Sequence, residues 1–161
     1  MKETIVIESV DKSVSNLLFN QQSHNFNSNT QLFIEDIFLS HNRLTGTIPE
    51  TIFDIQSLQQ VYMGHNYLSG KLSTKLGSLP MLKMFNVSHN GFVATIPNET
   101  FYSTSLESLD LSYNNMWGEL SSSFRDLKTL RHLFLHKNDF DGTIPVELGE
   151  CNLSKGFMSN D

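Results

Sequence analysis

The chain has 161 residues, of which 39% are hydrophobic and 17% charged, which is typical of one soluble globular domain and excludes a disordered or fibrous protein. The formal net charge is -6 without a basic cluster, which argues against a nucleic-acid partner. Hydrophobic runs stay below the roughly 20 residues of a membrane span, and Ile5–Ile7 is too short for a signal-peptide core. The sequence therefore predicts neither a membrane span nor a secretion signal.

The N-terminal segment, residues 1–33, differs from the rest of the chain because it contains no repeat. Thr4–Val10 alternates hydrophobic and polar residues, which predicts an extra strand covering the edge of the strand expected at Ile34–Leu39. Gln21–Thr30 is polar enough for a loop or a disordered stretch. We expect a cap strand followed by a polar loop.

An internal repeat of 24 residues follows, marked by five asparagines: Asn42, Asn66, Asn90, Asn114 and Asn138. In every unit the positions eight, five and three residues before the asparagine, and two and six after it, are hydrophobic. Such a period identifies a repeat architecture. It divides the chain into five units over residues 34–153 and a truncated tail, residues 154–161, without the strand of a sixth unit.

Each unit predicts one short strand followed by a sharp turn. Alternating hydrophobic residues such as Leu133 and Leu135 indicate a strand with one buried face. The long crossovers require parallel pairing and a right-handed coil. An asparagine amide both donates and accepts hydrogen bonds, so the five asparagines can bond the backbone of neighbouring coils as a structural ladder.

The position four residues after the asparagine is glycine in four units, which predicts a tight turn with positive φ. Ala94 occupies it in the third unit, so either that unit is locally different or the position does not need positive φ. The seventh position is proline in units one, three and five, whereas Ser73 and Ser121 replace it in units two and four, an alternation the sequence does not explain.

Hydrophobic pairs three residues apart, such as Ile52 and Ile55, predict a helical or 3₁₀ turn on the far side of each coil. In the third unit Thr100 and Ser103 stand at these positions, and Phe101 is expected to take over the packing. Cys151 belongs to the same series in the fifth unit, so a buried structural role is expected. A single cysteine also excludes an internal disulfide and a cysteine-rich zinc site.

The repeat over residues 34–153 has the consensus L-x-x-L-x-L-x-x-N-x-L-x-G-x-I, and some units contain the motif Leu-Ser-x-Asn or end in Ile-Pro. This pattern resembles the plant type of leucine-rich repeat. The resemblance implies an α/β leucine-rich-repeat fold: a right-handed solenoid with a parallel β-sheet on its concave face and 3₁₀ or irregular turns on its convex face. It further implies a non-catalytic module that recognises a protein or peptide, placed at the cell surface or outside the cell. The paired cysteines with which extracellular members cap their ends are missing here.

Outward-facing positions of the strands would line the concave face, which changes from acidic to basic along the chain. The predicted partner-binding residues are Phe38, His41, Tyr62, His65, Met84, His89, Asp110, Tyr113, Arg131, Phe134 and Lys137. Exposed aromatic side chains beside charges often anchor interfaces, so the hypothesis centres on Tyr62 and Phe134. The alternative is that these side chains only cover the sheet.

His41, His65 and His89 form a column in which successive residues are expected to lie about 5 Å apart. Such histidines could bind a metal ion or act as a pH sensor near pH 6.5. Tyr113 and Lys137 end the column and no carboxylate completes a ligand set, so no metal site and no cofactor are predicted. The chain also lacks the phosphate-binding, hydrolase, metalloprotease and kinase motifs, so no enzyme is predicted.

Three N-x-S/T sequons, at Asn86, Asn98 and Asn152, are candidate glycosylation sites and only weak evidence for secretion. A glycan on Asn86 would obstruct the concave face. Two other interpretations stay open: an intracellular leucine-rich-repeat scaffold or adaptor, and a nonfunctional fragment of a larger receptor.

Overall fold

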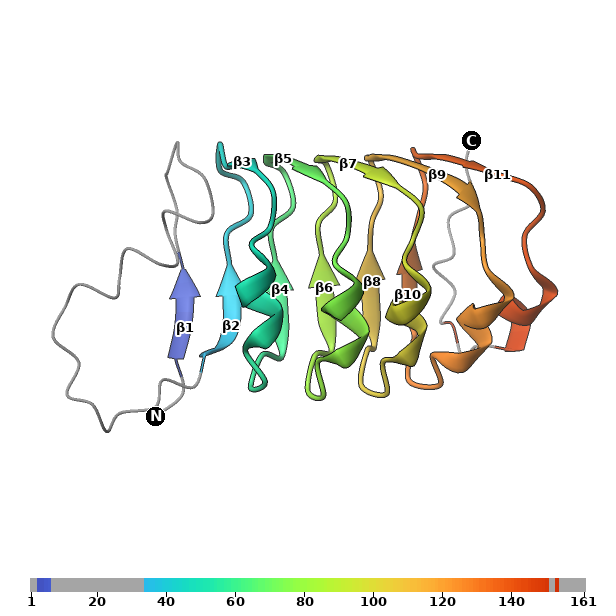
Figure 1. Ribbon diagram of the computed structural model, residues 1–161, viewed down its shortest axis with the longest axis horizontal. Helices are drawn as coiled ribbons and strands as arrows, with labels where there is room; N and C mark the ends of the chain where they lie inside the picture. The colour runs from blue at the N-terminus through green and yellow to red at the C-terminus, as the bar shows by residue number, and fades with distance from the viewer. Residues whose placement is uncertain (1–2, 7–33, 151–152, 154–161) are drawn as a thin grey trace, which may run out of the picture.

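The computed structural model of the protein describes residues 3–6, 34–150 and 153, and its coils follow one another along the long axis of the molecule (Figure 1). Within these residues no helix has the length and hydrophobicity that crossing a membrane requires. The predictions for Gln21–Thr30, Cys151 and residues 154–161 concern segments outside the described residues.

The main sheet takes one strand from each coil, and all its pairings are parallel, as the crossovers predicted. In the described part of the chain its order is β1 (Glu3–Val6), β2 (Ile34–Phe38), β4 (Gln60–Tyr62), β6 (Met84–Asn86), β8 (Ser108–Asp110) and β10 (His132–Phe134). From β2 onward each residue pairs with the one 24 positions later, as Asp36 does with Gln60. β1 pairs with β2 at the edge where the extra strand was expected, with Thr4 opposite Asp36.

A second parallel sheet runs along one edge of the coils, after each turn (Figure 1). Its strands are β3 (Thr45–Gly46), β5 (Tyr67–Gly70), β7 (Gly91–Ala94), β9 (Asn115–Glu119) and β11 (Asp139–Asp141). Here the pairing partner is 22 positions away, as for Thr45 with Tyr67 and Val93 with Asn115. The sequence analysis did not anticipate this sheet.

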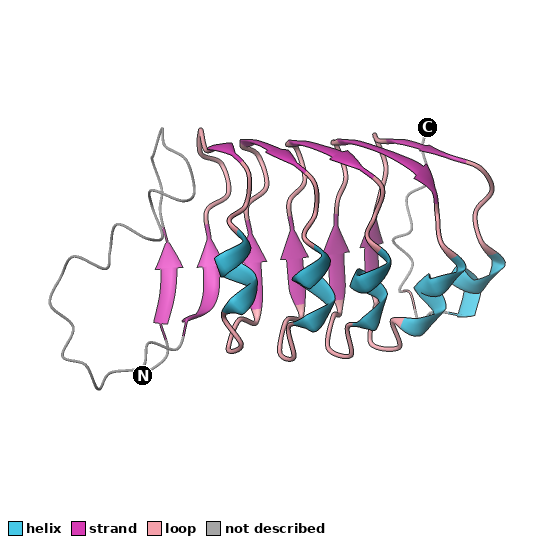
Figure 2. Ribbon diagram, in the orientation of Figure 1, coloured by secondary structure: helices cyan, strands magenta, loops and turns pink. Residues whose placement is uncertain are grey.

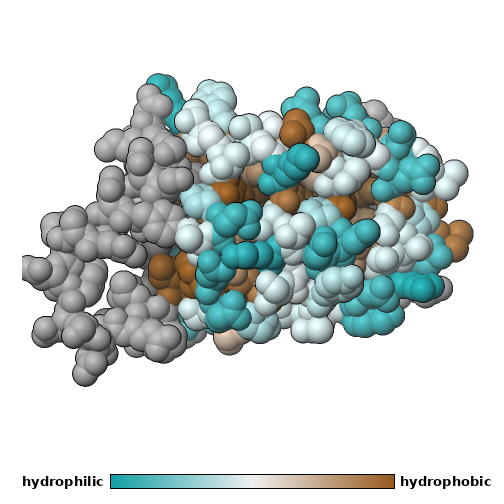
Figure 3. Space-filling model, viewed as in Figure 1, coloured by the Kyte–Doolittle hydropathy of each residue, from teal (hydrophilic) through white to brown (hydrophobic). Residues whose placement is uncertain are grey.

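Each coil then closes through a short 3₁₀ helix, which confirms the prediction made from the three-residue spacing. Figure 2 shows these helices as a row in front of the main sheet. They are η2 (Glu50–Asp54), η3 (Thr74–Ser78), η4 (Asn98–Tyr102), η5 (Ser122–Asp126) and η6 (Val146–Glu150). The molecular face that carries them is mostly hydrophilic, with hydrophobic residues scattered between polar ones (Figure 3).

The proline and the serine that alternate at the seventh position meet the same requirement at the start of these helices. Pro49 and Pro97 precede η2 and η4 with φ of -65° and -62°, the angle that the proline ring enforces. Ser73 and Ser121 have nearly the same backbone angles, and their side chains accept a hydrogen bond from the backbone N–H two residues later. Proline and serine are therefore two solutions to one capping position.

The asparagine side chains bond adjacent coils across the core. Asn66 Nδ2 donates to the carbonyl oxygen of Leu39 in the preceding coil at 2.9 Å, and its Oδ1 accepts from the N–H of Leu44 at 3.0 Å. Asn90, Asn114 and Asn138 repeat both bonds to their own preceding coils. These bonds satisfy backbone groups that would otherwise be buried without partners.

Both expectations for Ala94 are wrong. Its φ is 75°, close to the 82°, 93°, 92° and 77° of the glycines at the same position in the other units. Ala94 pairs within β7, as Gly46, Gly70 and Gly118 do within their own strands. The position therefore needs positive φ in every coil. The pairing of Ala94 with Met116 of β9 holds Ala94 in a conformation that alanine adopts only at a cost.

The third unit packs as predicted around its polar residues. Thr100 and Ser103 are buried, and the ring of Phe101 lies edge-on against that of Phe124, with centroids 4.8 Å apart. The Ser103 hydroxyl accepts a hydrogen bond from the N–H of Leu106. The hydroxyl of Thr100 is buried without a partner among the described residues.

Candidate protein-binding face

Strand alternation places one column of side chains at the middle of the exposed face of the main sheet: Phe38, Tyr62, Asn86, Asp110 and Phe134. All five are partly exposed, whereas the residues on either side of each, such as Val61 and Met63, are buried. This column is the centre of the candidate face.

The aromatic residues of the column fall into two separate groups. The rings of Phe38 and Tyr62 stack with centroids 5.3 Å apart. Phe134 lies in β10, and β6 and β8 separate it from β4, which holds Tyr62. Tyr62 and Phe134, on which the sequence hypothesis centred, are therefore not neighbours. They occupy the same position in the repeat, but three units apart, and each unit moves that position one strand further along the sheet.

A hydrogen-bonded polar pair lies between the two aromatic groups. Asn86 Nδ2 donates to Asp110 Oδ2 at 3.1 Å. Asn86 Oδ1 accepts hydrogen bonds from the N–H and the hydroxyl of Ser88, and Asp110 Oδ1 accepts the equivalent two from Ser112. These bonds fix the orientation of both side chains, so the polar middle of the face is preorganised.

A stack of aromatic rings borders the column where the strands turn. His41, His65, His89 and Tyr113 lie in line, with successive ring centroids 4.3, 4.0 and 3.9 Å apart and interplanar angles of 13° to 15°. All four have φ between 51° and 58°, and Lys137 shares this conformation. The N–H of each stacked residue bonds the carbonyl of the next coil, as His65 does with Ser88 at 2.9 Å, so each coil presents its ring in the same direction.

Stacking changes the acid–base behaviour of the central imidazole. Burial, and then the nearby His89 and His41, lower the pKa of His65 below its ordinary value, while Asp110 opposes the shift. A protonated neighbour at this distance would repel a charge on His65, so the stack favours the neutral form of His65. Among the described residues no group of three or more histidine, cysteine, aspartate or glutamate side chains is arranged to hold a metal ion.

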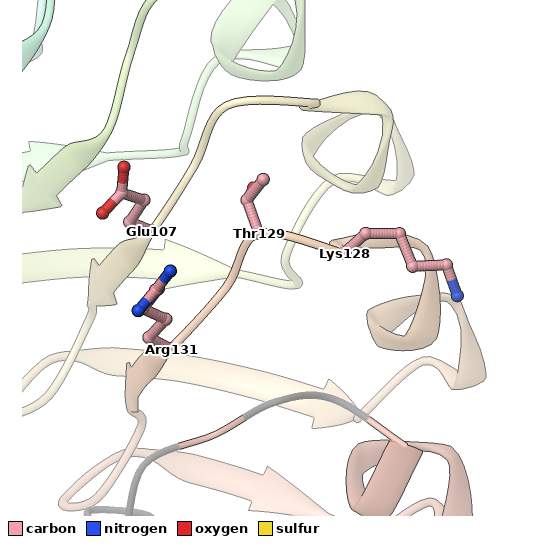
Figure 4. Close-up of a pocket in the computed structure, with 4 residues that line it drawn as sticks. All are labelled: Glu107, Lys128, Thr129 and Arg131. Carbon is pink, nitrogen blue, oxygen red and sulfur yellow. The ribbon is translucent and has the colours of Figure 1, made fainter.

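The basic end of the face has a small pocket of about 330 Å³ lined by Glu107, Lys128, Thr129 and Arg131. The side chain of Arg131 extends toward Glu107, whereas that of Lys128 extends away from both (Figure 4). Thr129 Oγ1 donates to the carbonyl of Leu106 at 2.8 Å and so joins the fourth and fifth coils. The pocket therefore has side chains of both charges in its lining, from the fourth and fifth coils.

The predicted partner-binding residues lie in three places. Phe38, Tyr62, Met84, Asp110 and Phe134 are in main-sheet strands; His41, His65, His89, Tyr113 and Lys137 are in the turns that follow; Arg131 directly precedes β10. The sequence also places Glu107 and His136 at outward-facing positions of the concave face, although neither is among the predicted partner-binding residues. The ring of His136 meets that of Tyr113 edge-on, with centroids 5.2 Å apart.

The three sequon asparagines also differ in place. Asn86 lies in β6 at the centre of the face, whereas Asn98 is exposed at the first residue of η4. Asn152 lies outside the described residues.

Comparison with known families gives a consistent result. A family model described as leucine rich repeat matches residues 80–140, and a second model with the same description matches residues 33–55 and 129–154. No curated protein matches the chain.

Similar solved structures come from plant receptors. The ectodomain of the Arabidopsis thaliana receptor kinase GASSHO1/SCHENGEN3, in complex with CASPARIAN STRIP INTEGRITY FACTOR 2, is 29% identical with a TM-score of 0.74 over 79% of this chain and 16% of that one. The Arabidopsis receptor kinase HAESA, in complex with the peptide hormone IDA and the co-receptor SERK1, is 30% identical with a TM-score of 0.72 over 74% of this chain and 20% of that one.

A shorter relative matches over most of its length. A chain of the BIR3–SERK2 complex from Arabidopsis thaliana is 33% identical, with a TM-score of 0.72 over 84% of this chain and 72% of that one. The chain thus spans less than a quarter of the two receptor ectodomains above and about three quarters of this relative.

Proposed function

The chain belongs to the leucine-rich repeat family, with repeats similar to those of plant receptor ectodomains, and we propose that it is a non-catalytic recognition module for a protein or peptide. The ligand would lie on the concave face of the main sheet. It would contact the middle column and the stack of His41, His65, His89 and Tyr113.

The comparisons support the class of partner. The solved HAESA structure contains a peptide hormone and a co-receptor, and that of GASSHO1/SCHENGEN3 contains a factor bound to the ectodomain. Since the chain corresponds to a small part of both, the identity of its ligand does not follow from theirs.

The observation that carries the proposal is the preorganised face itself. Ordered aromatic rings, Phe38 on Tyr62 and the four-ring stack, offer apolar surface that loses little side-chain entropy on binding. Between them the Asn86–Asp110 pair offers fixed polar groups. Interfaces use this combination of aromatic anchors and oriented polar contacts.

The charges of the face predict the polarity of the ligand. Glu35 and Asp36 lie at the β2 end, and Arg131 and Lys137 lie at the β10 end. A peptide with basic residues over β2 and an acidic segment or a free carboxylate over β10 would match both ends.

The test uses a random peptide library displayed on phage, selected against the whole chain. Affinities of the enriched synthetic peptides are then measured against Tyr62→Ala and, as the matched control, Tyr102→Ala. Tyr102 is 72% exposed on η4, away from the main sheet. We expect Tyr62→Ala to weaken binding about tenfold or more, a change of about 1.4 kcal/mol, because a central aromatic anchor is lost.

Tyr102→Ala should leave the affinities unchanged. Failure to enrich any peptide, or an equal loss of affinity in the two variants, would reject the concave face as the binding surface.

A further inference from the structure

We propose that Asn98, of the two sequon asparagines within the described residues, is the one that receives an N-linked glycan when the chain passes through the secretory pathway. The inference is independent of the recognition function, because it concerns the opposite side of the coil. It rests on three observations: the exposure of Asn98, the engagement of Asn86, and the buried hydroxyl of Thr100.

Asn98 is an accessible acceptor. It is exposed at the start of η4, on the side of the coil away from the main sheet. A hollow of about 260 Å³ adjoins it, lined in addition by Thr95, Ile96, Pro97, Phe101, Glu119 and Ser121. The first sugar of a glycan would have space there, and the candidate binding face would stay uncovered.

A glycan on Asn86 is incompatible with the hydrogen bonds that this side chain makes once the chain has folded. Its Nδ2 donates to Asp110 Oδ2, and its Oδ1 accepts from the N–H and hydroxyl of Ser88. The side chain is also closely packed, since a Cβ added at Gly64 would lie 2.8 Å from Asn86 Oδ1. A glycan on Asn86 would disturb this network at the centre of the sheet.

The third observation is the buried hydroxyl of Thr100. It has no exposed surface, and Ile52, Leu76 and Phe124 fill the same place in neighbouring coils. The Thr100 hydroxyl has no hydrogen-bond partner among the described residues, so at this core position it is unfavourable for the folded state. A sequon needs a hydroxyl two residues after the asparagine, and Thr100 provides it for Asn98 before the coil closes.

The chemistry is a transfer to the unfolded chain. The amide nitrogen of Asn98 forms a bond to the anomeric carbon of an oligosaccharide carried on a lipid pyrophosphate. The bond between that carbon and the pyrophosphate oxygen breaks, the lipid pyrophosphate leaves, and one amide proton is released. Thr100 then folds into the core with its role complete.

The experiment expresses the whole chain behind a secretion signal in human cells, with cells and medium pooled so that poorly folded variants are counted. Glycosidase treatment in heavy-oxygen water, followed by peptide mass spectrometry, marks each formerly glycosylated asparagine. We expect occupancy at Asn98, retention of the glycan in Thr100→Ser, and its loss in Asn98→Gln and Thr100→Val.

A second measurement separates the sequon from the core. In protein made in bacteria without glycans, Thr100→Val should raise the Tm by on the order of 2–4 °C, because an unpaired hydroxyl leaves the core. An unoccupied Asn98 in the wild type would overturn the acceptor assignment. An unchanged or lower Tm in Thr100→Val would overturn the argument from the buried hydroxyl.

Discussion

The second and third coils follow the same backbone path although they differ at two positions that help to determine it. Gly70 and Ala94 have φ of 93° and 75°, and Leu76 and Thr100 occupy the same place in the core. The third coil thus keeps the same backbone path although Ala94 does not favour the positive φ of the turn and the polar Thr100 does not favour burial in the core. The difference teaches that contacts with neighbouring coils, rather than the sequence of one coil, hold the geometry.

The largest effect should come from breaking those contacts at Asn114. Its Oδ1 accepts from the N–H of Phe92 and its Nδ2 donates to the carbonyl of Val87, both in the third coil. Asn114→Ala leaves both groups buried without partners and should lower the free energy of unfolding by about 4 kcal/mol. Urea denaturation followed by the fluorescence of the single tryptophan, Trp117, measures the change.

Asn115→Ala is the control, because Asn115 is the exposed neighbour in β9 and should change stability by about 0.5 kcal/mol or less. Similar losses in both variants would show that the asparagine ladder does not join the third and fourth coils energetically.

The next effect should follow from giving the second coil the core residue of the third. Leu76→Thr removes buried apolar surface and adds an unpaired hydroxyl, which should destabilise the protein by about 3 kcal/mol. In the third coil Phe101 fills the space beside Thr100. The equivalent Gly77 cannot be enlarged, because a Cβ there would clash with the carbonyl oxygen of Glu99.

Thermal unfolding of Leu76→Thr is compared with that of Met81→Thr, a substitution at a half-exposed site. A Tm for Leu76→Thr as high as that of Met81→Thr would mean that the second coil tolerates the polar residue without a compensating aromatic ring.

The turn residues should give smaller effects of opposite sign. Gly118→Ala forces alanine to a φ of 92° and brings its Cβ to 2.7 Å from Thr95 Cγ2, so a loss of about 1–2 kcal/mol is expected. Ala94→Gly relieves the same conformation and should gain up to about 1 kcal/mol. Both are measured by urea denaturation.

Gly149→Ala is the matched control, since a Cβ at Gly149 meets no atom within 4 Å and its φ is not in the left-handed region. A loss in Ala94→Gly, or a Gly118→Ala variant as stable as Gly149→Ala, would contradict the assigned strain.

The smallest effect should be the pH response of the histidine stack. Because the pKa of folded His65 lies below the unfolded value of 6.5, the folded chain binds fewer protons than the unfolded chain as the pH falls. This part of the stability is complete above pH 6.5 and is lost as the pH falls through the lowered pKa. His65→Asn keeps a residue that tolerates positive φ and removes the titration.

The Tm at about pH 7.5 and at about pH 5 should therefore differ less in His65→Asn than in the wild type. His132→Asn, in β10, serves as the control and should keep the wild-type difference. An equal difference in all three proteins would exclude the stack as its source.

Much of this fold is predictable from the period alone. Columns such as Leu133 and Leu135 indicated the strands, the spacing of Ile52 and Ile55 indicated the 3₁₀ turns, and the asparagines indicated the core hydrogen bonds. These features depend only on residue type at a fixed place in the repeat, which a sequence displays directly.

The rest depends on geometry between coils. The positive φ of Ala94 accompanies its pairing with Met116 in the next coil and contradicts the preference of alanine itself. The stacking of His65 on His89 requires the turn conformation as well as the column. The placement of Tyr62 and Phe134 in separate groups follows from the distance between β4 and β10, which residue types do not encode.

The two sheets pair with different offsets, 24 residues in the main sheet and 22 in the second. Each coil is therefore level with the one before it on one side and displaced by two residues, about 7 Å, on the other. In a longer array of the same coils, the main sheet would therefore keep equivalent side chains in straight columns, whereas in the second sheet each strand would pair two residues out of step with its equivalent in the previous coil.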